Sequence, residues 1–381
     1  MLETFLNKKP LYYDVIDYTR MPRIYETLKT KIALPKIIHL IGTNGKGTTG
    51  RFLATALHSM GYSVGHYTSP HILEFNERIW LNGENATTEL LNTTHKSLLS
   101  LLTSEDAEAL SYFEYTTLLA VLLYEKCDYI VLEAGLGGEY DATAVFENIL
   151  TLVTPIDKDH EAFLGTTIKE IASTKLNAVQ TKAILAKQPN ADVYEVAQKI
   201  AEKKDISIES YDNYLDTNDI KAVESIAKKL QLSTYLQENL SLAIAGVNYL
   251  GLKYDEESFN DSRLFGRLSP LGKNILIDVG HNTLAATKIY ESLKQKQYVL
   301  VYNSYKDKNY REILRILKPL IQHVEIIKVE DIRIESKDIL EKTVEGLGLK
   351  YRDFEKIETQ NNYLVFGSFS VAEAFLKVYH E

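Results

Sequence analysis

A chain of 381 residues is long enough for two domains or one large one. Its composition, 45% hydrophobic and 25% charged, is that of a globular protein, and a net charge of −9 argues against binding to nucleic acids or acidic membranes. The single cysteine, Cys127, excludes an intrachain disulfide and suits a reducing compartment. Residues 1–18 hold no signal-peptide pattern and no stretch is apolar enough to span a membrane, so we expect a cytoplasmic protein.

The first part of the chain alternates strand-like runs with helical stretches. The runs at 128–135 and 148–156 have the continuous β-branched character of parallel strands covered on both faces. The stretch at 112–127 is apolar nearly all round, which predicts a buried helix. Gly61 should end a different helix, predicted at 48–61. Further strands are expected at 36–42 and 62–68, and further helices at 48–61, 167–175, 224–230 and 239–251.

Glycine and proline cluster at 265–272, which predicts a domain boundary. Beyond it, strand-like runs at 274–280, 297–305, 323–329 and 362–368 alternate with helical stretches. We therefore expect an α/β protein with two domains. Residues 1–265 should form the first domain, around a parallel sheet, and residues 266–381 a smaller α/β domain.

A glycine-rich segment, HLIGTNGKGTTGRF at 39–52, lies between a predicted strand and a predicted helix. Its glycines, from Gly42 to Gly47, allow turns that aim N–H groups at phosphate oxygens, and Lys46 can reach the terminal phosphates. The common loop G-x-x-x-x-G-K-[ST] has its hydroxyl residue directly after the lysine. Here Gly47 intervenes and Thr48 follows one position late. The segment predicts a phosphate loop of altered spacing; a ligand-free turn is the less common alternative.

Polar residues follow several other predicted strands. Glu133 ends one of them, where an unpaired buried carboxylate would be costly, so a metal–nucleotide complex or nearby backbone N–H groups should compensate it. His160 follows another and could ligate a metal, although a lone histidine is more often structural. Ser69-Pro70 alone would indicate an ordinary turn. A dinucleotide fingerprint at 135–140 is excluded because Tyr140 replaces its last glycine.

The spacing GTNGKGT resembles the folylpolyglutamate synthase/dihydrofolate synthase branch of the Mur ligase superfamily, which has a glycine after the lysine. Other segments resemble the same family in the same order along nearly the whole chain. They are TSPHILEFNERI, EAGLGGEYDAT, DHEAFLGTTIKEIASTK, FGRL, DVGHN, YKDKN and VFGSFSVAEAF. One departure is Glu139-Tyr140, where the family has Arg-Leu, and the sequence after Lys175 departs as well.

The resemblance implies that residues 1–265 form a phosphate-loop ATPase domain with a folate site and that residues 266–381 form a Rossmann-like domain. It also implies a role for each matching position. Nucleotide-binding residues would be Gly42, Thr43, Asn44, Gly45, Lys46, Gly47, Thr48, Arg267, Asp278, His281 and Asn282. Metal ligands would be Ser69, Glu133, His160 and, once carbamylated, Lys175. Folate-site residues would be Thr68, Pro70, Phe75 and Asp141, and the catalytic residues Lys46, His160 and Lys175.

The resemblance also implies a reaction. The chain would be an ATP-dependent ligase that joins L-glutamate to dihydropteroate and to reduced folates through an acyl phosphate, as a monomer. Its cofactors would be two Mg²⁺ ions, with K⁺ a further candidate. The alternatives are one of these two activities alone, a Mur-type amino-acid ligase, or a non-catalytic nucleotide-binding regulator. Gly47 and the short segment before the phosphate loop argue against the Mur type.

Overall fold

The computed structural model describes residues 1–9, 17–294 and 296–380; residues 10–16, within the amino-terminal stretch considered above, lie outside the described residues. The chain divides into two compact units. Unit 1 is Met1–Leu232 with Leu236–Ser262, and unit 2 is Ser233–Tyr235 with Arg263–Glu381. Each unit has α/β architecture around a mainly parallel sheet, as predicted. In the described part of the chain, no helix has the length and apolar character that crossing a bilayer requires.

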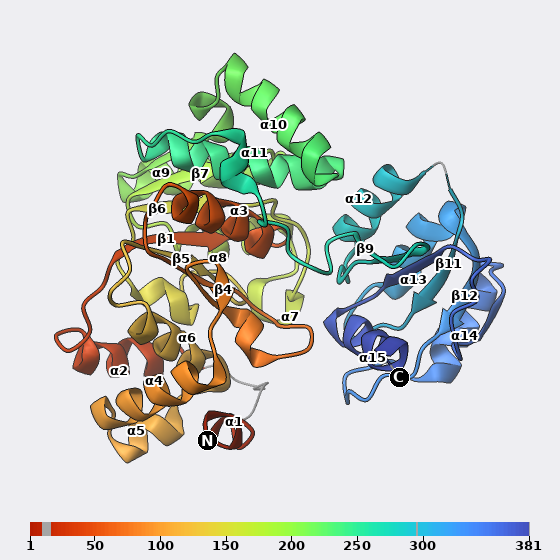
Figure 1. Ribbon diagram of the computed structural model, residues 1–381, viewed down its shortest axis with the longest axis horizontal. Coiled ribbons are helices and arrows are strands. Elements are labelled where there is room, and N and C mark those ends of the chain that lie inside the picture. The colour runs from red at the N-terminus through yellow and green to blue at the C-terminus, as the bar shows by residue number, and fades with distance from the viewer. Residues whose placement is uncertain (10–16, 295, 381) are drawn as a thin grey trace. The chain divides into compact units, whose positions relative to one another are not determined.

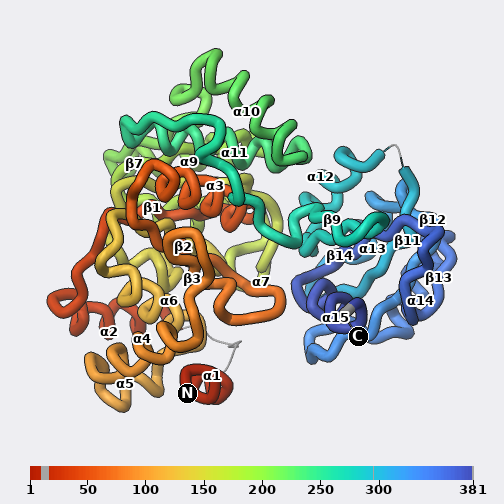
Figure 2. The backbone as a smooth tube through the Cα atoms, viewed as in Figure 1, coloured from red at the N-terminus to blue at the C-terminus, as the bar shows by residue number. Residues whose placement is uncertain are grey.

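The sheet of unit 1 has eight strands within the described residues, in the order β4-β3-β2-β5-β1-β6-β7-β8. Six neighbouring strands run parallel, namely β2, β5, β1, β6, β7 and β8. In contrast, β3 is antiparallel to β2, its neighbour in Figure 2. The bounds are β1 Lys36–Ile41, β2 Val64–Tyr67, β3 Ile79–Leu81, β4 Glu84–Asn85, β5 Tyr129–Glu133, β6 Leu150–Val153, β7 Lys182–Leu185 and β8 Ser207–Ser210. The antiparallel edge was not predicted, because β3 and β4 are too short to show a period of two.

Helices cover both faces of this sheet. In Figure 1, α3 and α11 lie on one side of β1, and α2, α4 and α6 on the other. The α-helices are α1 Leu2–Leu6, α2 Arg20–Leu28, α3 Lys46–Ser59, α4 Thr88–Leu101, α5 Ser104–Ala109, α6 Tyr112–Leu123, α7 Glu161–Leu164, α8 Ile168–Leu176, α9 Asp192–Lys204, α10 Thr217–Leu230 and α11 Thr234–Tyr249. Short 3₁₀ turns are η1 Phe75–Arg78, η2 Ala142–Val145, η3 Tyr211–Tyr214 and η4 Glu256–Phe259.

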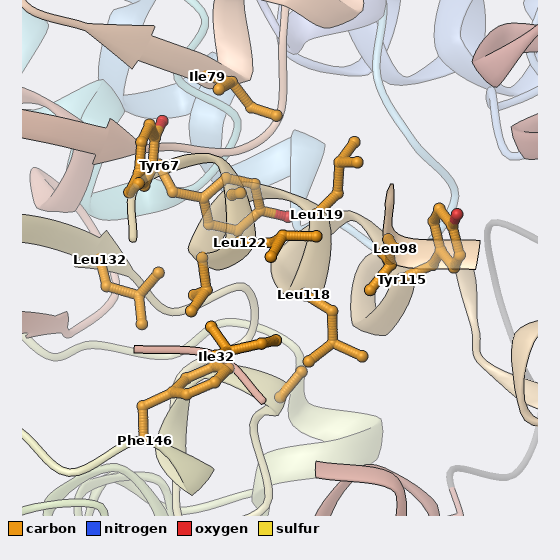
Figure 3. Packing of buried hydrophobic residues seen from close by; sticks show 14 of the residues in the cluster. Ile32, Tyr67, Ile79, Leu98, Tyr115, Leu118, Leu119, Leu122, Leu132 and Phe146 are labelled. Atoms are coloured by element: carbon orange, nitrogen blue, oxygen red, sulfur yellow. The ribbon is translucent and has the colours of Figure 1, made fainter. Parts of the chain in front are cut away.

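The helix predicted to be buried, α6, is covered along most of its length. Its Tyr115 and Leu118 are fully buried and belong to a cluster with Leu132 of β5 and Phe146 (Figure 3). Replacing a buried leucine such as Leu118 by alanine costs about 2–5 kcal/mol. This packing holds β5, and so the residues that follow it, firmly in the sheet.

The helix predicted at 48–61 begins two residues earlier, at Lys46. Gly45 has φ +94°, in the left-handed region, and turns the chain directly into the helix. Gly47 and Thr48 therefore lie in its first turn and not in the loop. The helix ends at Ser59, and Gly61 with φ +93° follows, as the sequence predicts.

Unit 2 contains a six-stranded sheet within the described residues, in the order β13-β12-β11-β14-β10-β9. The four predicted strands are present, and the short strands β9 and β13 extend the sheet at its edges. The core includes Leu300, Val324, Leu364 and Phe366 from the sheet. The bounds are β9 Ser269–Leu271, β10 Ile275–Ile277, α12 Thr283–Leu293, β11 Tyr298–Tyr302, α13 Tyr310–Leu317, η5 Lys318–Leu320, β12 Ile321–Ile326, α14 Lys337–Gly346, β13 Tyr351–Asp353, β14 Tyr363–Phe366 and α15 Phe369–His380.

Candidate active site

Four neighbouring strands of unit 1 end at the same edge of its sheet. β2, β5, β1 and β6 are adjacent and parallel, so the segments that follow them meet at their carboxyl ends. In chain order these segments begin at Gly42, Thr68, Ala134 and Thr154. Open α/β sheets bind their ligands at this edge. The fold therefore collects the predicted phosphate loop, the 68–70 segment, Glu133 and the 157–160 segment from four distant stretches of sequence.

The glycines of the phosphate loop are required by close contacts. Gly42 has φ +136°, and a Cβ there would stand 2.1 Å from Thr154 Oγ1. A Cβ on Gly45 would stand 2.5 Å from Oδ1 of Asn239, a buried residue of α11. The hydroxyl of Thr43 donates to Asp157 O at 3.0 Å, which ties the loop to the segment after β6. The loop is a rigid turn that delivers the chain to the start of α3.

The late threonine of the loop is buried at the start of α3. Thr48 is 2% exposed, and its Oγ1 has no hydrogen-bond partner within the described residues. Oγ1 of the neighbouring Thr49 is in the same state. A buried hydroxyl without a partner is unfavourable, and the positive end of a helix favours an anion beside it. Both features fit a nucleotide phosphate or its metal ion at this position.

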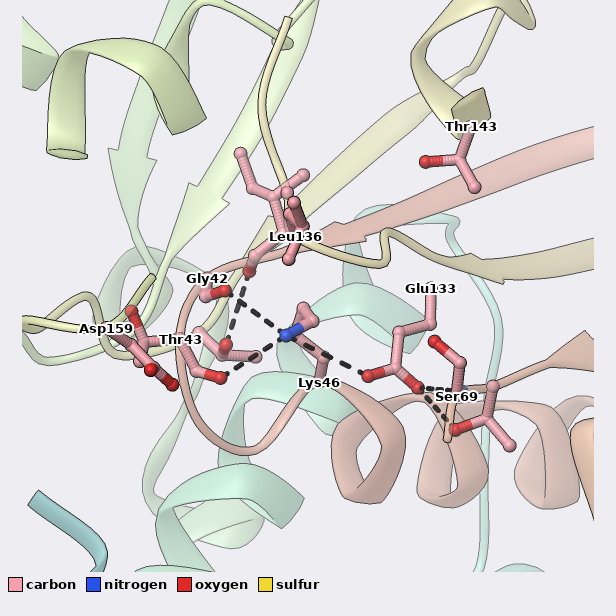
Figure 4. A network of polar contacts seen from close by, with 12 residues as sticks. Gly42, Thr43, Lys46, Ser69, Glu133, Leu136, Thr143 and Asp159 are labelled. Atoms are coloured by element: carbon pink, nitrogen blue, oxygen red, sulfur yellow. Dashed lines mark hydrogen bonds and ion pairs between the residues drawn. The ribbon is translucent and has the colours of Figure 1, made fainter. Parts of the chain in front are cut away.

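Lys46 and Glu133 face each other across the carboxyl ends of β1 and β5 (Figure 4). Lys46 Nζ donates to the carbonyl oxygens of Gly42 at 3.3 Å and Thr43 at 3.2 Å, and lies 3.9 Å from Glu133 Oε1. The other carboxylate oxygen, Oε2, accepts from the Thr68 hydroxyl and from Ser69 N at 3.2 Å. Glu133 is 4% exposed, so these contacts compensate its buried charge. Of the two predicted kinds of partner, a backbone N–H group is present, at Ser69, and Lys46 and Thr68 supply the other contacts.

Lys175 of α8 is 1% exposed and points at the same loop. Its Nζ donates to Gly42 O at 3.0 Å and to Leu136 O at 2.6 Å. Burial, aided by the positive charge of Lys46, lowers the pKa of Lys175 to about 7. A large share of this amine is therefore neutral at physiological pH, which is the form that reacts with carbon dioxide to give a carbamate.

His160 lies next to Asp159 at this edge. It has φ +51° and precedes α7; its Nε2 is 3.9 Å from Asp159 Oδ2, and about a third of the side chain is exposed. Within the described residues, no group of three His, Cys, Asp or Glu side chains could hold a metal ion. A magnesium ion at this edge would therefore also need ligands such as a serine hydroxyl, a carbamate or nucleotide phosphates.

The segment after Ser69 forms an aromatic and basic group. The ring of Phe75 contacts Tyr112 edge-to-face, with centroids 6.4 Å apart. The guanidinium of Arg78 lies 5.2 Å from the Tyr112 ring centroid, and its Nε donates to His71 Nδ1 at 2.7 Å. Burial and the charge of Arg78 lower the pKa of His71 to about 4, so its ring is neutral. Of these residues only Phe75 was predicted, because the contact between Arg78 and Tyr112 exists only once α6 is placed beside the loop.

Asp141 accepts hydrogen bonds from Gly137 N at 3.1 Å and from Thr143 N at 3.0 Å, and so braces the 134–143 loop. Beside it stands the departure from the family, Glu139-Tyr140. Tyr140 is 56% exposed, and its ring lies 4.5 Å from that of Tyr18. At the two positions where the resemblance leads us to expect arginine and leucine, this chain therefore has an acidic residue and an exposed aromatic pair.

The four predicted nucleotide residues of unit 2 cluster around β10 and α12. Asp278 is buried and accepts from Tyr235 OH, Leu268 N and Gly280 N, each at 2.8 Å. Burial raises the pKa of Asp278, while Arg267 opposes the shift. Asn282 Oδ1 caps α12 by accepting from Ala285 N at 2.9 Å. The remaining pair, Arg267 and His281, bond to the carbonyl oxygens of Gly266 and Val279 respectively.

The chain is similar in sequence and in structure to several known proteins. No protein-family model matches it. The dihydrofolate synthase/folylpolyglutamate synthase of Haemophilus influenzae is 30% identical over 358 residues, which cover 84% of this chain and 80% of that protein. The crystal structure of Helicobacter pylori folylpolyglutamate synthetase superposes with a TM-score of 0.81 and 39% identity, covering 100% of this chain and 98% of that one.

Two further structures share the fold at lower identity. Escherichia coli FolC in complex with DHPP and ADP has a TM-score of 0.82 and 22% identity, covering 99% of this chain and 96% of that one. The bifunctional synthase of Yersinia pestis, complexed with AMPPNP and a Mn ion, has the same TM-score and identity, covering 100% and 97%. The two-unit α/β fold, the phosphate-loop edge and the extent of these matches agree, and the chain belongs to the dihydrofolate synthase/folylpolyglutamate synthase family of ATP-dependent ligases.

Proposed function

We propose that this enzyme adds L-glutamate both to dihydropteroate and to reduced folates. The observation that carries the proposal is the buried group of Lys46, Glu133 and Lys175 at the phosphate loop. Lys46 can hold the phosphates of ATP while a substrate carboxylate attacks, and Glu133 with a carbamylated Lys175 can hold a metal ion beside them. Residues 1–265 would supply the ATP and folate sites, and residues 266–381 would complete the ligase. DHPP and ADP in the E. coli relative support this choice of substrates.

The chemistry follows in two steps. An oxygen of the acceptor carboxylate attacks the γ-phosphorus of ATP, and the bond to ADP breaks, leaving an acyl phosphate and ADP. The α-amino group of glutamate then attacks the activated carbonyl carbon, loses a proton, and displaces inorganic phosphate. Lys46 and the first N–H groups of α3 orient the γ-phosphate and stabilise the negative charge that develops on it.

Ser69, Glu133, His160 and a carbamylated Lys175 would hold two magnesium ions. The Mn ion in the Y. pestis relative, the unpartnered Thr48 hydroxyl and the buried Glu133 carboxylate support divalent metal here. When bound, magnesium supplies positive charge that offsets the phosphate charge. The Lys175 amine now donates hydrogen bonds to two carbonyl oxygens. Carbamylation would convert it into an anionic metal ligand. A potassium ion is a further candidate cofactor.

Two observations bear on which acceptors the enzyme uses. Relatives such as the H. influenzae protein are named for both synthase activities, which supports a bifunctional enzyme. The Glu139-Tyr140 departure lies beside Asp141, at the proposed folate site, and could shift the balance between the two acceptors. We expect a monomer that works in the cytoplasm, where ATP and folates are available.

A phosphate-release assay tests the proposal. The enzyme is supplied with ATP, Mg²⁺ and L-glutamate, and dihydropteroate or tetrahydrofolate is added separately. We expect release with each acceptor, dependent on glutamate. Lys46→Ala should lower kcat at least a hundredfold, the scale on which one stabilising group acts in a transition state, while the protein stays folded. Release with only one acceptor would reject bifunctionality, and release with neither would reject the activity.

A further inference from the structure

A chain of hydrogen bonds joins the strand before the phosphate loop to Asp141. His39 lies on β1, three residues before Gly42. Its Nε2 is 2.8 Å from Thr143 Oγ1, and Thr143 Oγ1 donates to Asp141 Oδ1 at 2.7 Å. His39 and Thr143 are each 1% exposed, whereas Asp141 is partly open to solvent. The mechanism above uses neither His39 nor Thr143.

The direction of each bond fixes the protonation of the histidine. Asp141 accepts from Gly137 N, Thr143 N and the Thr143 hydroxyl, a set of donors that suits an ionised carboxylate. The Thr143 proton is therefore committed to Asp141, and its oxygen can only accept from His39. His39 must carry its proton on Nε2, which leaves Nδ1 without one.

The other ring nitrogen of His39 supports this assignment. Nδ1 is buried and has no hydrogen-bond partner within the described residues. A buried N–H without an acceptor would be costly, and a bare nitrogen is the less costly state. Burial also lowers the pKa of His39 to about 4, so the ring stays neutral at physiological pH. A merely apolar core position would be filled better by a residue without this unpartnered nitrogen.

We propose that His39 is a positioning residue that, through Thr143, fixes the Asp141 carboxylate for the pteroate or folate substrate. This inference rests on the proposed function, in which Asp141 contacts the acceptor. Asp141 also holds Gly137, one residue after Leu136, whose carbonyl oxygen receives Lys175. The same chain of bonds thus links β1 and its phosphate loop to the loop that borders the proposed acceptor site.

Three variants separate positioning from packing. In His39→Gln the side-chain amide nitrogen reaches near the Nε2 position, whereas in His39→Asn it lies near Nδ1 and loses Thr143. Thr143→Val keeps the shape and removes the hydroxyl. We expect His39→Asn and Thr143→Val to raise KM for the acceptor about tenfold, the scale of one hydrogen bond to a charged group, with KM for ATP within about twofold. The KM of His39→Gln for the acceptor should stay near that of the wild type.

An equal rise in both KM values, or an unchanged acceptor KM in His39→Asn and Thr143→Val, would overturn the inference. Nitrogen-15 NMR of the wild type supplies a readout independent of turnover. We expect the proton of His39 on Nε2 and a bare Nδ1; the opposite tautomer would overturn the inference. If the wild type released no phosphate with any acceptor, the proposed function would fail, while the NMR result would still test the hydrogen-bond chain separately.

Discussion

Lys175 tests whether a buried residue of the site is kept for catalysis although it lowers the stability of the folded protein. A lysine that is 1% exposed, beside a second lysine, destabilises the folded protein unless its amine is neutral. Replacing it with methionine keeps a similar volume and removes the amine. We expect Lys175→Met to lose ligase activity and to remove a pH-dependent destabilisation. The two effects together would mark a residue kept for chemistry and not for stability.

The size of the effect follows from the pKa of Lys175. Its value is about 7 in the folded protein against 10.5 for the unperturbed amine. Between these values the unfolded chain binds more protons than the folded one, so the free energy of unfolding of the wild type rises with pH. The slope approaches about 1.4 kcal/mol per pH unit. Between pH 7 and pH 9 the free energy of unfolding of the wild type should therefore rise by about 2 kcal/mol relative to that of Lys175→Met.

Urea unfolding at both pH values, in buffers free of carbon dioxide, measures this difference. Comparing the two pH values cancels the pH-independent cost of the lost bonds to Gly42 and Leu136. Lys169→Met is the matched control, because Lys169 belongs to the same helix but is exposed and paired with Glu195. The control should show no comparable change with pH. A difference between wild type and Lys175→Met that is the same at pH 7 and pH 9 would refute the reasoning.

Two further substitutions test the loop and the second unit. Gly45→Ala places a Cβ at φ +94° and 2.5 Å from Asn239 Oδ1, so we expect at least a tenfold loss of ATP affinity by calorimetry; unchanged affinity would contradict the rigid-loop account. Asn282→Ala removes the cap of α12 and should lower the free energy of unfolding by about 1 kcal/mol. Asn282→Asp keeps the cap, so a loss of ATP affinity in that variant, with stability retained, would support the nucleotide role, and unchanged affinity would argue against it.

Local patterns predicted the frame of the site well. A strand, closely spaced glycines and a helix follow one another within 36–59, so their order could be read without tertiary information. Glu133 could be placed at the sheet edge because the carboxyl ends of parallel strands share one edge. The start of α3 was wrong by two residues, since a left-handed Gly45 can begin a helix without a side-chain cap.

Contacts between segments that are distant along the chain could not be predicted from the sequence. Nothing near Lys175 indicates that it reaches Gly42 across 133 positions, or that this burial depresses its pKa. The pairing of His71 with Arg78 over Tyr112 likewise depends on how α6 packs beside the loop. Resemblance to the family supplied Lys175 as a candidate, while its surroundings came only from the fold.

The central claim is that the phosphate loop activates a substrate carboxylate by phosphorylating it. The most direct measurement uses an acceptor whose carboxylate carries oxygen-18, with ATP and glutamate, and analyses the released phosphate by mass spectrometry. If an acyl phosphate forms, one carboxylate oxygen leaves with the phosphate, so each phosphate should carry one labelled oxygen. Phosphate released without label, while the amide product still forms, would contradict the account.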